Sequence, residues 1–248
     1  MHRNTLVMLM SLFVLTVSPM NAAGQFSAGI VMSDVRPTTG LGTCVLTNQS
    51  REETVLAVLD TRPLEQETAQ VVLLHMQEAV SLEANAQPTD IDAQYALAAV
   101  LGSRAEVEGG RTLVKTAQAL HAQTLHVLSL DPDHGGAQYL MGRLHAGVMR
   151  MDRVTRFVAI RLLGGGALSG ASWGEARARL EAAVMDDPCV PDHHYELARL
   201  YAERGDRNLA ISQLEQLDDL TPSAPFASVF ERASELLDEL RLQSAGSD

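Results

Sequence analysis

The stretch PDHHYELARLYAERGDRNLAISQLEQLDDLTP, residues 191–222, contains two helical patterns separated by a break. Apolar residues recur in it at spacings of three and four, which is the period of one face of an α-helix. Gly205 and Asp206 interrupt the pattern, and Pro222 ends it because proline cannot continue a helical hydrogen-bond ladder. With the two turn residues that follow, this helix–turn–helix unit is 34 residues long.

The same pattern opens two earlier units, IDAQYALAAVL (91–101) and GGAQYLMGRLH (135–145). All three units have tyrosine at the fifth position, and these residues are Tyr95, Tyr139 and Tyr195. Three positions later each unit has a small residue that lets two antiparallel helices approach closely, namely Ala98, Gly142 and Ala198. A repeated helical pair of 34 residues is typical of tetratricopeptide repeats. We therefore predict an all-α fold, a tetratricopeptide-like right-handed helical-repeat solenoid.

The helical period extends over most of the chain, and no strand-like alternation interrupts it. Aromatic residues make up only 4% of the chain, which also favours helices over strands. We expect helices over 65–85, 91–107, 111–129, 135–149, 152–163, 173–186, 191–204, 207–219 and 225–242. The repeat domain is therefore predicted over 65–242, with its last helix as a cap and residues 243–248 as a disordered tail.

The middle unit contains an insertion that a standard repeat lacks. Its first helix is expected to end near Met151 and its second to begin near Trp173, with DRVTRFVAIRLLGGGALSGAS (152–172) between them. This sequence predicts an inserted short helix followed by a Gly-rich loop. The loop is not a phosphate-binding loop, because no strand precedes it and no Lys and Ser/Thr follow its glycines.

Three segments carry a resemblance to a known family: QYLMGRLH (138–145), RFVAIRLLGGGALSGASWGEARARLEAAV (156–184) and HHYELARLYAERGD (193–206). Over about residues 110–242 the chain resembles the regulators of microtubule dynamics and their bacterial relatives of tetratricopeptide type. The resemblance implies an α-helical repeat domain that acts by binding proteins, without known catalysis.

The first 24 residues have the layout of a secretory signal peptide. His2 and Arg3 form a basic start, an apolar run follows, and small residues precede an expected cleavage near residues 22–24. We therefore expect an exported, periplasmic or otherwise extracytoplasmic protein, with residues 25–64 as a flexible tether and lead-in. An uncleaved N-terminal segment that anchors the chain in a membrane is the alternative. Export would also permit a disulfide between Cys44 and Cys189, a pairing that the sequence leaves open.

The repeated tyrosines mark the first candidate site, a partner-binding groove. The first helices of such units line the concave face of a solenoid, and Arg143 and Arg199 lie one helical turn beyond Tyr139 and Tyr195. Aromatic rings and arginine are residue types that dominate protein interfaces. One hypothesis is a groove for a peptide or helix of a partner, formed by Tyr95, Tyr139, Arg143, Tyr195 and Arg199. The other is that the tyrosines pack between adjacent helices.

Uneven charge marks the second candidate site. The chain has a formal charge of −12, yet residues 134–179 hold seven arginines and two acids. A basic patch at and before the insertion is formed by Arg150, Arg153, Arg156 and Arg161. It would suit an anionic lipid or an acidic partner. Alternatively, these arginines pair with acidic residues of neighbouring helices.

These observations favour a non-catalytic scaffold or adaptor whose partner is a protein. An acidic chain of pI about 5.0 is not suited to nucleic acid, and membrane contact is expected only through the N-terminus or the arginine patch. We expect no cofactor, no metal and no catalytic residue. His193 and His194 diverge by about 100° on a helix, so they do not easily share an ion. A membrane-anchored adaptor and a helical enzyme or metal-binding protein are the alternatives.

Overall fold

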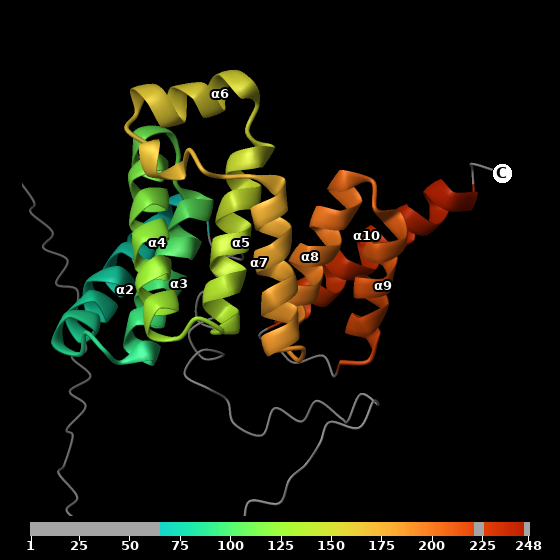
Figure 1. The fold of residues 1–248 in the computed structure, drawn as a ribbon, viewed down its shortest axis with the longest axis horizontal. Helices are drawn as coiled ribbons and strands as arrows, with labels where there is room; N and C mark the ends of the chain where they lie inside the picture. Colours follow the sequence, from blue (N-terminus) through green and yellow to red (C-terminus); the bar gives the residue numbers. More distant parts are fainter. Residues whose placement is uncertain (1–64, 221–225, 246–248) are drawn as a thin grey trace, which may run out of the picture. The chain divides into compact units, whose positions relative to one another are not determined.

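The computed structural model describes residues 65–220 and 226–245, and every regular element in this part of the chain is a helix (Figure 1). The prediction of an all-α fold is therefore confirmed. The elements are, in chain order, α2 (Gln66–Ala86), α3 (Ile91–Val107), α4 (Gly110–Leu130), α5 (Gly135–Arg150), α6 (Arg153–Phe157), η1 (Val158–Leu162), η2 (Gly166–Leu168), α7 (Trp173–Asp186), α8 (Pro191–Arg204), α9 (Arg207–Asp218) and α10 (Ala227–Ala245).

The helices begin and end where local chemistry favours it. The Asp90 carboxylate accepts a hydrogen bond from the backbone N–H of Ala93 and so caps α3, and the Ser172 hydroxyl caps α7 in the same way. Pro191 stands in the first turn of α8, where a missing N–H costs nothing. Gly205 ends α8 with a left-handed backbone of φ +83°, a conformation that glycine adopts without steric cost.

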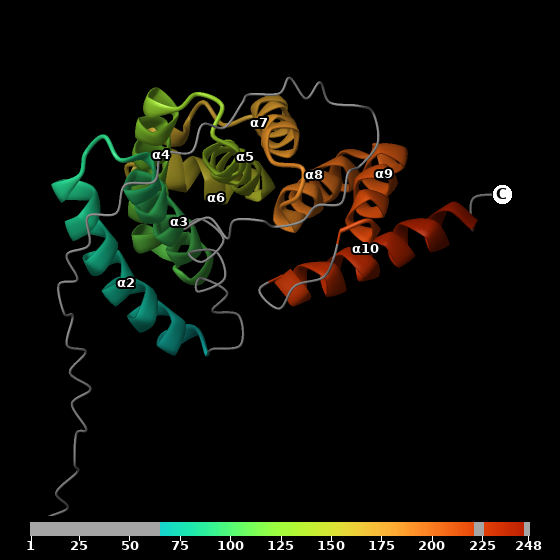
Figure 2. The same cartoon turned by 90° about the horizontal axis from the view of Figure 1, so that it is seen from below.

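Neighbouring helices pack in chain order, and the first helices of the three units also contact one another. The helix pairs α3 with α4, α5 with α7, and α8 with α9 form the most extensive contacts of their units. In addition α3 contacts α5, α5 contacts α8, and α8 contacts α10, which also packs on α9 (Figure 2). Each unit is thus joined to the next through its first helix.

Small residues lie where these helices meet. Ala98, Ala198 and Ala210 are completely buried in the main apolar core. A Cβ on Gly142 would lie 2.7 Å from Cγ of Leu180, so α5 and α7 approach each other only because this position lacks a side chain. The small residues of the repeat are therefore located at tight helix–helix contacts.

The insertion lies across one end of α4 and α5 (Figure 1). The predicted short helix is divided into α6 and a π-helical turn, η1, before the chain reverses at Gly164, whose φ is +89°. The N–H of Gly165 donates a 3.0 Å hydrogen bond to the carbonyl of Ala159 and a Cβ there would lie 2.7 Å from the same oxygen. This close contact explains why position 165 of the loop is a glycine.

The last helix, α10, is amphipathic. Its inner face buries Val229, Ala233, Leu237 and Leu240, whereas acidic residues between them are exposed. The helix extends to Ala245, three residues beyond the predicted end of the domain. In the part of the chain that the structure describes, no helix is long and apolar enough to cross a membrane.

Several predictions concern residues outside the described part: the signal peptide 1–24, the tether 25–64, and residues 246–248 of the predicted tail 243–248, whose first three residues belong to α10. Cys44 also lies outside the described part. Cys189, between α7 and α8, is disulfide-bonded.

Candidate functional site: an ionic network and an apolar cavity

The three repeated tyrosines are buried rather than displayed. Tyr95, Tyr139 and Tyr195 are 2%, 3% and 9% exposed. The ring of Tyr95 packs on His134 with 4.7 Å between centroids, and the ring of Tyr139 packs on His193 at 5.0 Å. Both histidines lie at the start of the first helix of the next unit. The tyrosine rings therefore pack between helices, which is the second of the two sequence hypotheses for them.

Cations cover two of these rings. The guanidinium of Arg143 lies 5.3 Å from the ring centre of Tyr139, on the same helix, as the spacing predicts. Tyr195 is covered not by Arg199 but by Arg232 of α10, at 4.4 Å. Burial raises the pKa of Tyr139 well above its usual value, so the phenol stays protonated.

Arg143 and Arg199 meet at a buried carboxylate that the sequence analysis did not single out. Glu196 has a side chain only 3% exposed, and its carboxylate pairs with Arg143 at 3.7 Å, Arg150 at 3.5 Å and Arg199 at 3.4 Å. Burial works to raise the pKa of Glu196, but the surrounding guanidinium groups outweigh it and hold that pKa below its ordinary value. The three arginines therefore face an ionised glutamate.

Further carboxylates extend this cluster to neighbouring helices. Arg143 also pairs with Glu106 of α3, while Arg150 and Arg199 pair with Glu203 at 2.9 Å and 3.2 Å. We call these six residues the ionic network: Glu106, Arg143, Arg150, Glu196, Arg199 and Glu203. The ionic network joins the first helices α3, α5 and α8. Glu196 follows Tyr195 directly in the repeat, the one sequence signal that could have indicated it.

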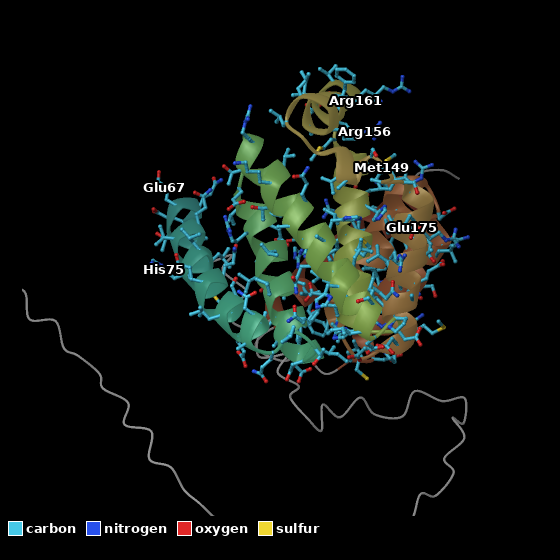
Figure 3. The ribbon with its side chains drawn as sticks, turned by 60° about the vertical axis from the view of Figure 1, so that its left-hand side comes forward. Glu67, His75, Met149, Arg156, Arg161 and Glu175 are labelled. Atoms are coloured by element: carbon cyan, nitrogen blue, oxygen red, sulfur yellow. The ribbon has the colours of Figure 1, made fainter. Side chains whose placement is uncertain are left out.

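The predicted basic patch is divided by the structure. Arg150 belongs to the ionic network, in agreement with the alternative of pairing with neighbouring acids. Arg156 is half-buried beside Met149 and donates to its carbonyl at 3.4 Å (Figure 3). Arg153 and Arg161 are exposed on the insertion. None of Arg153, Arg156 and Arg161 forms an ion pair with a residue that the structure describes.

A cavity of about 270 Å³ lies between α3, α4, α5 and the insertion. We call it the insertion cavity. Its wall is mostly apolar, and the larger apolar residues that line it are Leu113, Val114, Leu120, Leu140, Leu144, Val148, Met151, Ile160 and Leu168. Arg143, Arg150, Arg156 and Glu106 also reach it. No sequence signal indicated this cavity, because its walls come from segments far apart in the chain.

The adjacent histidines are structural. His193 Nδ1 hydrogen-bonds to the carbonyl of Ala183 at 3.2 Å, and His194 hydrogen-bonds to the carbonyl of Pro188 and to Gln213. Burial lowers the pKa of His193 to about 4. Over residues 65–220 and 226–245, no three His, Cys, Asp or Glu side chains gather closely enough to hold a metal ion.

Comparison with known proteins gives one informative result. No curated protein matches the chain. The family model described as "Regulator of microtubule dynamics protein 1-3" matches residues 61–241, which includes the insertion and all three tyrosine units. The resemblance seen in the sequence is thus confirmed, and it begins earlier than residue 110. The chain belongs to the family of regulator of microtubule dynamics proteins 1-3.

Proposed function

We propose that the chain is an exported, non-catalytic adaptor that binds a segment of a protein partner along the first helices α3, α5 and α8. The ionic network carries this proposal. It places acidic and basic side chains on the first helices of all three units, and its outer groups reach solvent, with side-chain exposures of 48% for Glu106 and 41% for Arg199. A peptide or helix that carries both acidic and basic side chains can pair with charges of the opposite sign on this surface.

The same observations support a tetratricopeptide-like solenoid as the framework. The helix pairs follow one another in order, and each first helix contacts the first helix of the next unit. The tyrosine and the small residue occupy the same positions in all three units. In a solenoid of this kind the first helices form the surface that receives partners. The tyrosines then hold that surface in place from beneath, and the exposed Glu106 and Arg199 contact the partner.

Export is the second part of the proposal, supported by the layout of residues 1–24 and by the oxidised state of Cys189. The name of the family refers to microtubules. An exported chain does not meet tubulin, so we propose a different protein partner here. N-terminal sequencing of the protein isolated from cells tests this part. A chain that begins near residues 22–24 supports export, whereas one that begins at Met1 in the membrane fraction supports the anchored alternative.

Partner capture tests the binding surface. The immobilised chain is exposed to proteins of its own compartment, and the set retained is compared with that of the Arg143→Glu/Arg199→Glu variant. We expect proteins that the wild type retains to be lost. The Arg207→Glu/Arg241→Glu variant makes the same charge change on α9 and α10 and is expected to retain them. Identical sets for all three chains, with helical circular dichroism unchanged, would refute the proposed surface.

A further inference from the structure

The volume of the insertion cavity limits what it can hold. An apolar cavity of about 150 Å³ accommodates benzene, with its six carbons. By the same proportion the 270 Å³ of the insertion cavity accommodates about ten carbons. That is one short apolar chain. It is too little space for a lipid with two long chains.

The charged residues in the wall of the insertion cavity indicate the chemistry of the ligand's polar end. Arg143 and Arg150 reach the insertion cavity, but both are matched by carboxylates of the ionic network. Arg156 differs, because its contacts within the described residues are the carbonyl and sulfur of Met149, with no carboxylate among them. A half-buried guanidinium with unused donors at the edge of an apolar cavity suits a single anionic group.

The wall formed by the insertion is weakly held and so can admit a ligand. Of α6 and η1, only Ala159 is buried, while Val154, Phe157 and Leu162 are exposed. Segments with few buried apolar contacts open at low free-energy cost. The π-helical turn of η1 is a feature that occurs frequently at functional sites.

We propose that the insertion cavity binds an amphiphile with one apolar chain of about ten carbons and a single anionic head group. The chain lies among Leu144, Val148 and Ile160, and the head group pairs with Arg156. The cavity shares Glu106, Arg143 and Arg150 with the ionic network, but Arg156 and Gly147 lie outside that network. Variants at Arg156 and Gly147 therefore test the cavity without changing the surface proposed for the protein partner.

Calorimetric titration of the purified full chain with decanoate tests the proposal. We expect one decanoate per chain, bound at least tenfold more weakly by Arg156→Gln, since a charged hydrogen bond is worth about that factor. Arg161→Gln is the matched control, because it removes an exposed arginine of the same insertion. Uncharged decanol should bind equally to wild type and Arg156→Gln.

A second variant blocks the apolar end. A Cβ at Gly147 meets no atom within 4 Å although the residue lines the cavity, so the side chain of Gly147→Leu can occupy the space. We expect decanoate binding to disappear while the circular dichroism spectrum stays that of the wild type. Decanoate binding that survives in Gly147→Leu, or that falls equally in Arg156→Gln and Arg161→Gln, would overturn the proposal. The second outcome would indicate adsorption on the basic surface instead.

Discussion

Two glycines of α5 have opposite surroundings. A Cβ on Gly142 would lie 2.7 Å from Cγ of the buried Leu180 and 3.2 Å from the carbonyl oxygen of Ala176, whereas a Cβ on Gly147 would meet nothing within 4 Å. Gly142→Ala should therefore separate α5 from α7 and lower the free energy of unfolding by about 1–3 kcal/mol. Gly147→Ala should raise it by about 0.5–1 kcal/mol, because alanine favours a helix over glycine. Urea unfolding of both variants tests this, and equal effects would contradict it.

His193 makes stability depend on pH. Its pKa is about 4 in the folded protein because the ring is buried, and about 6.5 in the unfolded chain. Between pH 6.5 and pH 4 the unfolded state binds more protons than the folded state, so the free energy of unfolding decreases as the pH falls. The contribution of the neutral His193 to stability is therefore complete above pH 6.5 and is lost as the pH falls to 4. The loss amounts to about 3 kcal/mol.

The His193→Asn variant isolates this effect. Burial also lowers the pKa of His134 and His145, so the wild type contains further contributions of the same sign. We therefore expect the free energy of unfolding of His193→Asn to fall less steeply between pH 6.5 and 4.5 than that of the wild type. Parallel curves for the two proteins would show that His193 does not titrate as described.

At the scale of the helices, Glu196 holds α8 to α5. Its buried carboxylate faces Arg143 and Arg150 of α5 and Arg199 of α8. In Glu196→Gln this charge is lost, while Glu106 and Glu203 still pair with the arginines. We expect a loss of about 2 kcal/mol in the free energy of unfolding, below the cost of leaving buried charges wholly unpaired.

An exposed pair provides the control for Glu196. Glu215 pairs with Arg241 between α9 and α10, and both side chains are more than half exposed. Glu215→Gln should change the free energy of unfolding by no more than about 0.5 kcal/mol. If the two glutamine variants were equally stable, burial of Glu196 would not strengthen its ion pairs.

The close approach of the Gly-rich loop to the backbone of η1 depends on the absence of a side chain at Gly165. A Cβ at Gly165 would lie 2.7 Å from the backbone oxygen of Ala159, and backbone cannot move aside as a flexible side chain can. Gly165→Ala should therefore open the loop and speed amide hydrogen exchange in η1, while Gly166→Ala, whose Cβ would meet no atom within 4 Å, should not. Hydrogen-exchange mass spectrometry distinguishes the two, and equal protection would contradict the prediction.

At the scale of the whole molecule, the oxidised Cys189 predicts a covalent constraint on the chain. The only other cysteine in the sequence is Cys44. Peptide analysis of the protein isolated from cells without reductant should find the two cysteines linked, and reduction should lower the free energy of unfolding by about 2–4 kcal/mol. Cys189→Ser should show the same loss. Two free thiols in the protein isolated in this way would contradict this prediction.

The helical elements were well predicted from the sequence. The predicted helices over 91–107, 173–186 and 191–204 coincide with α3, α7 and α8. Apolar period, caps and glycine breaks are local signals, and here they agree with the tertiary contacts. The main local departure is η1, where the insertion adopts a π-helical turn that apolar spacing does not reveal.

The candidate sites were predicted only in part. The sequence spacing correctly predicted that Arg143 lies beside Tyr139, because both lie on one helix face. The spacing could not predict the contact of Arg232 with Tyr195 or of Glu106 with Arg143, since each of these pairs joins two different helices. The repeat showed that the tyrosines are equivalent but left open whether they face a groove or the core.

The amino-acid sequence of this chain was sufficient to predict its helical class, its repeated units, its insertion and its family. Each of these can be recognised from the apolar periodicity and the motifs along the chain. The burial of the tyrosines, the ionic network around Glu196 and the insertion cavity emerged only from the tertiary structure. All three depend on which faces of distant helices meet. That information is non-local: it arises from packing between segments far apart in the chain, such as Arg150 and Glu203, which are 53 residues apart.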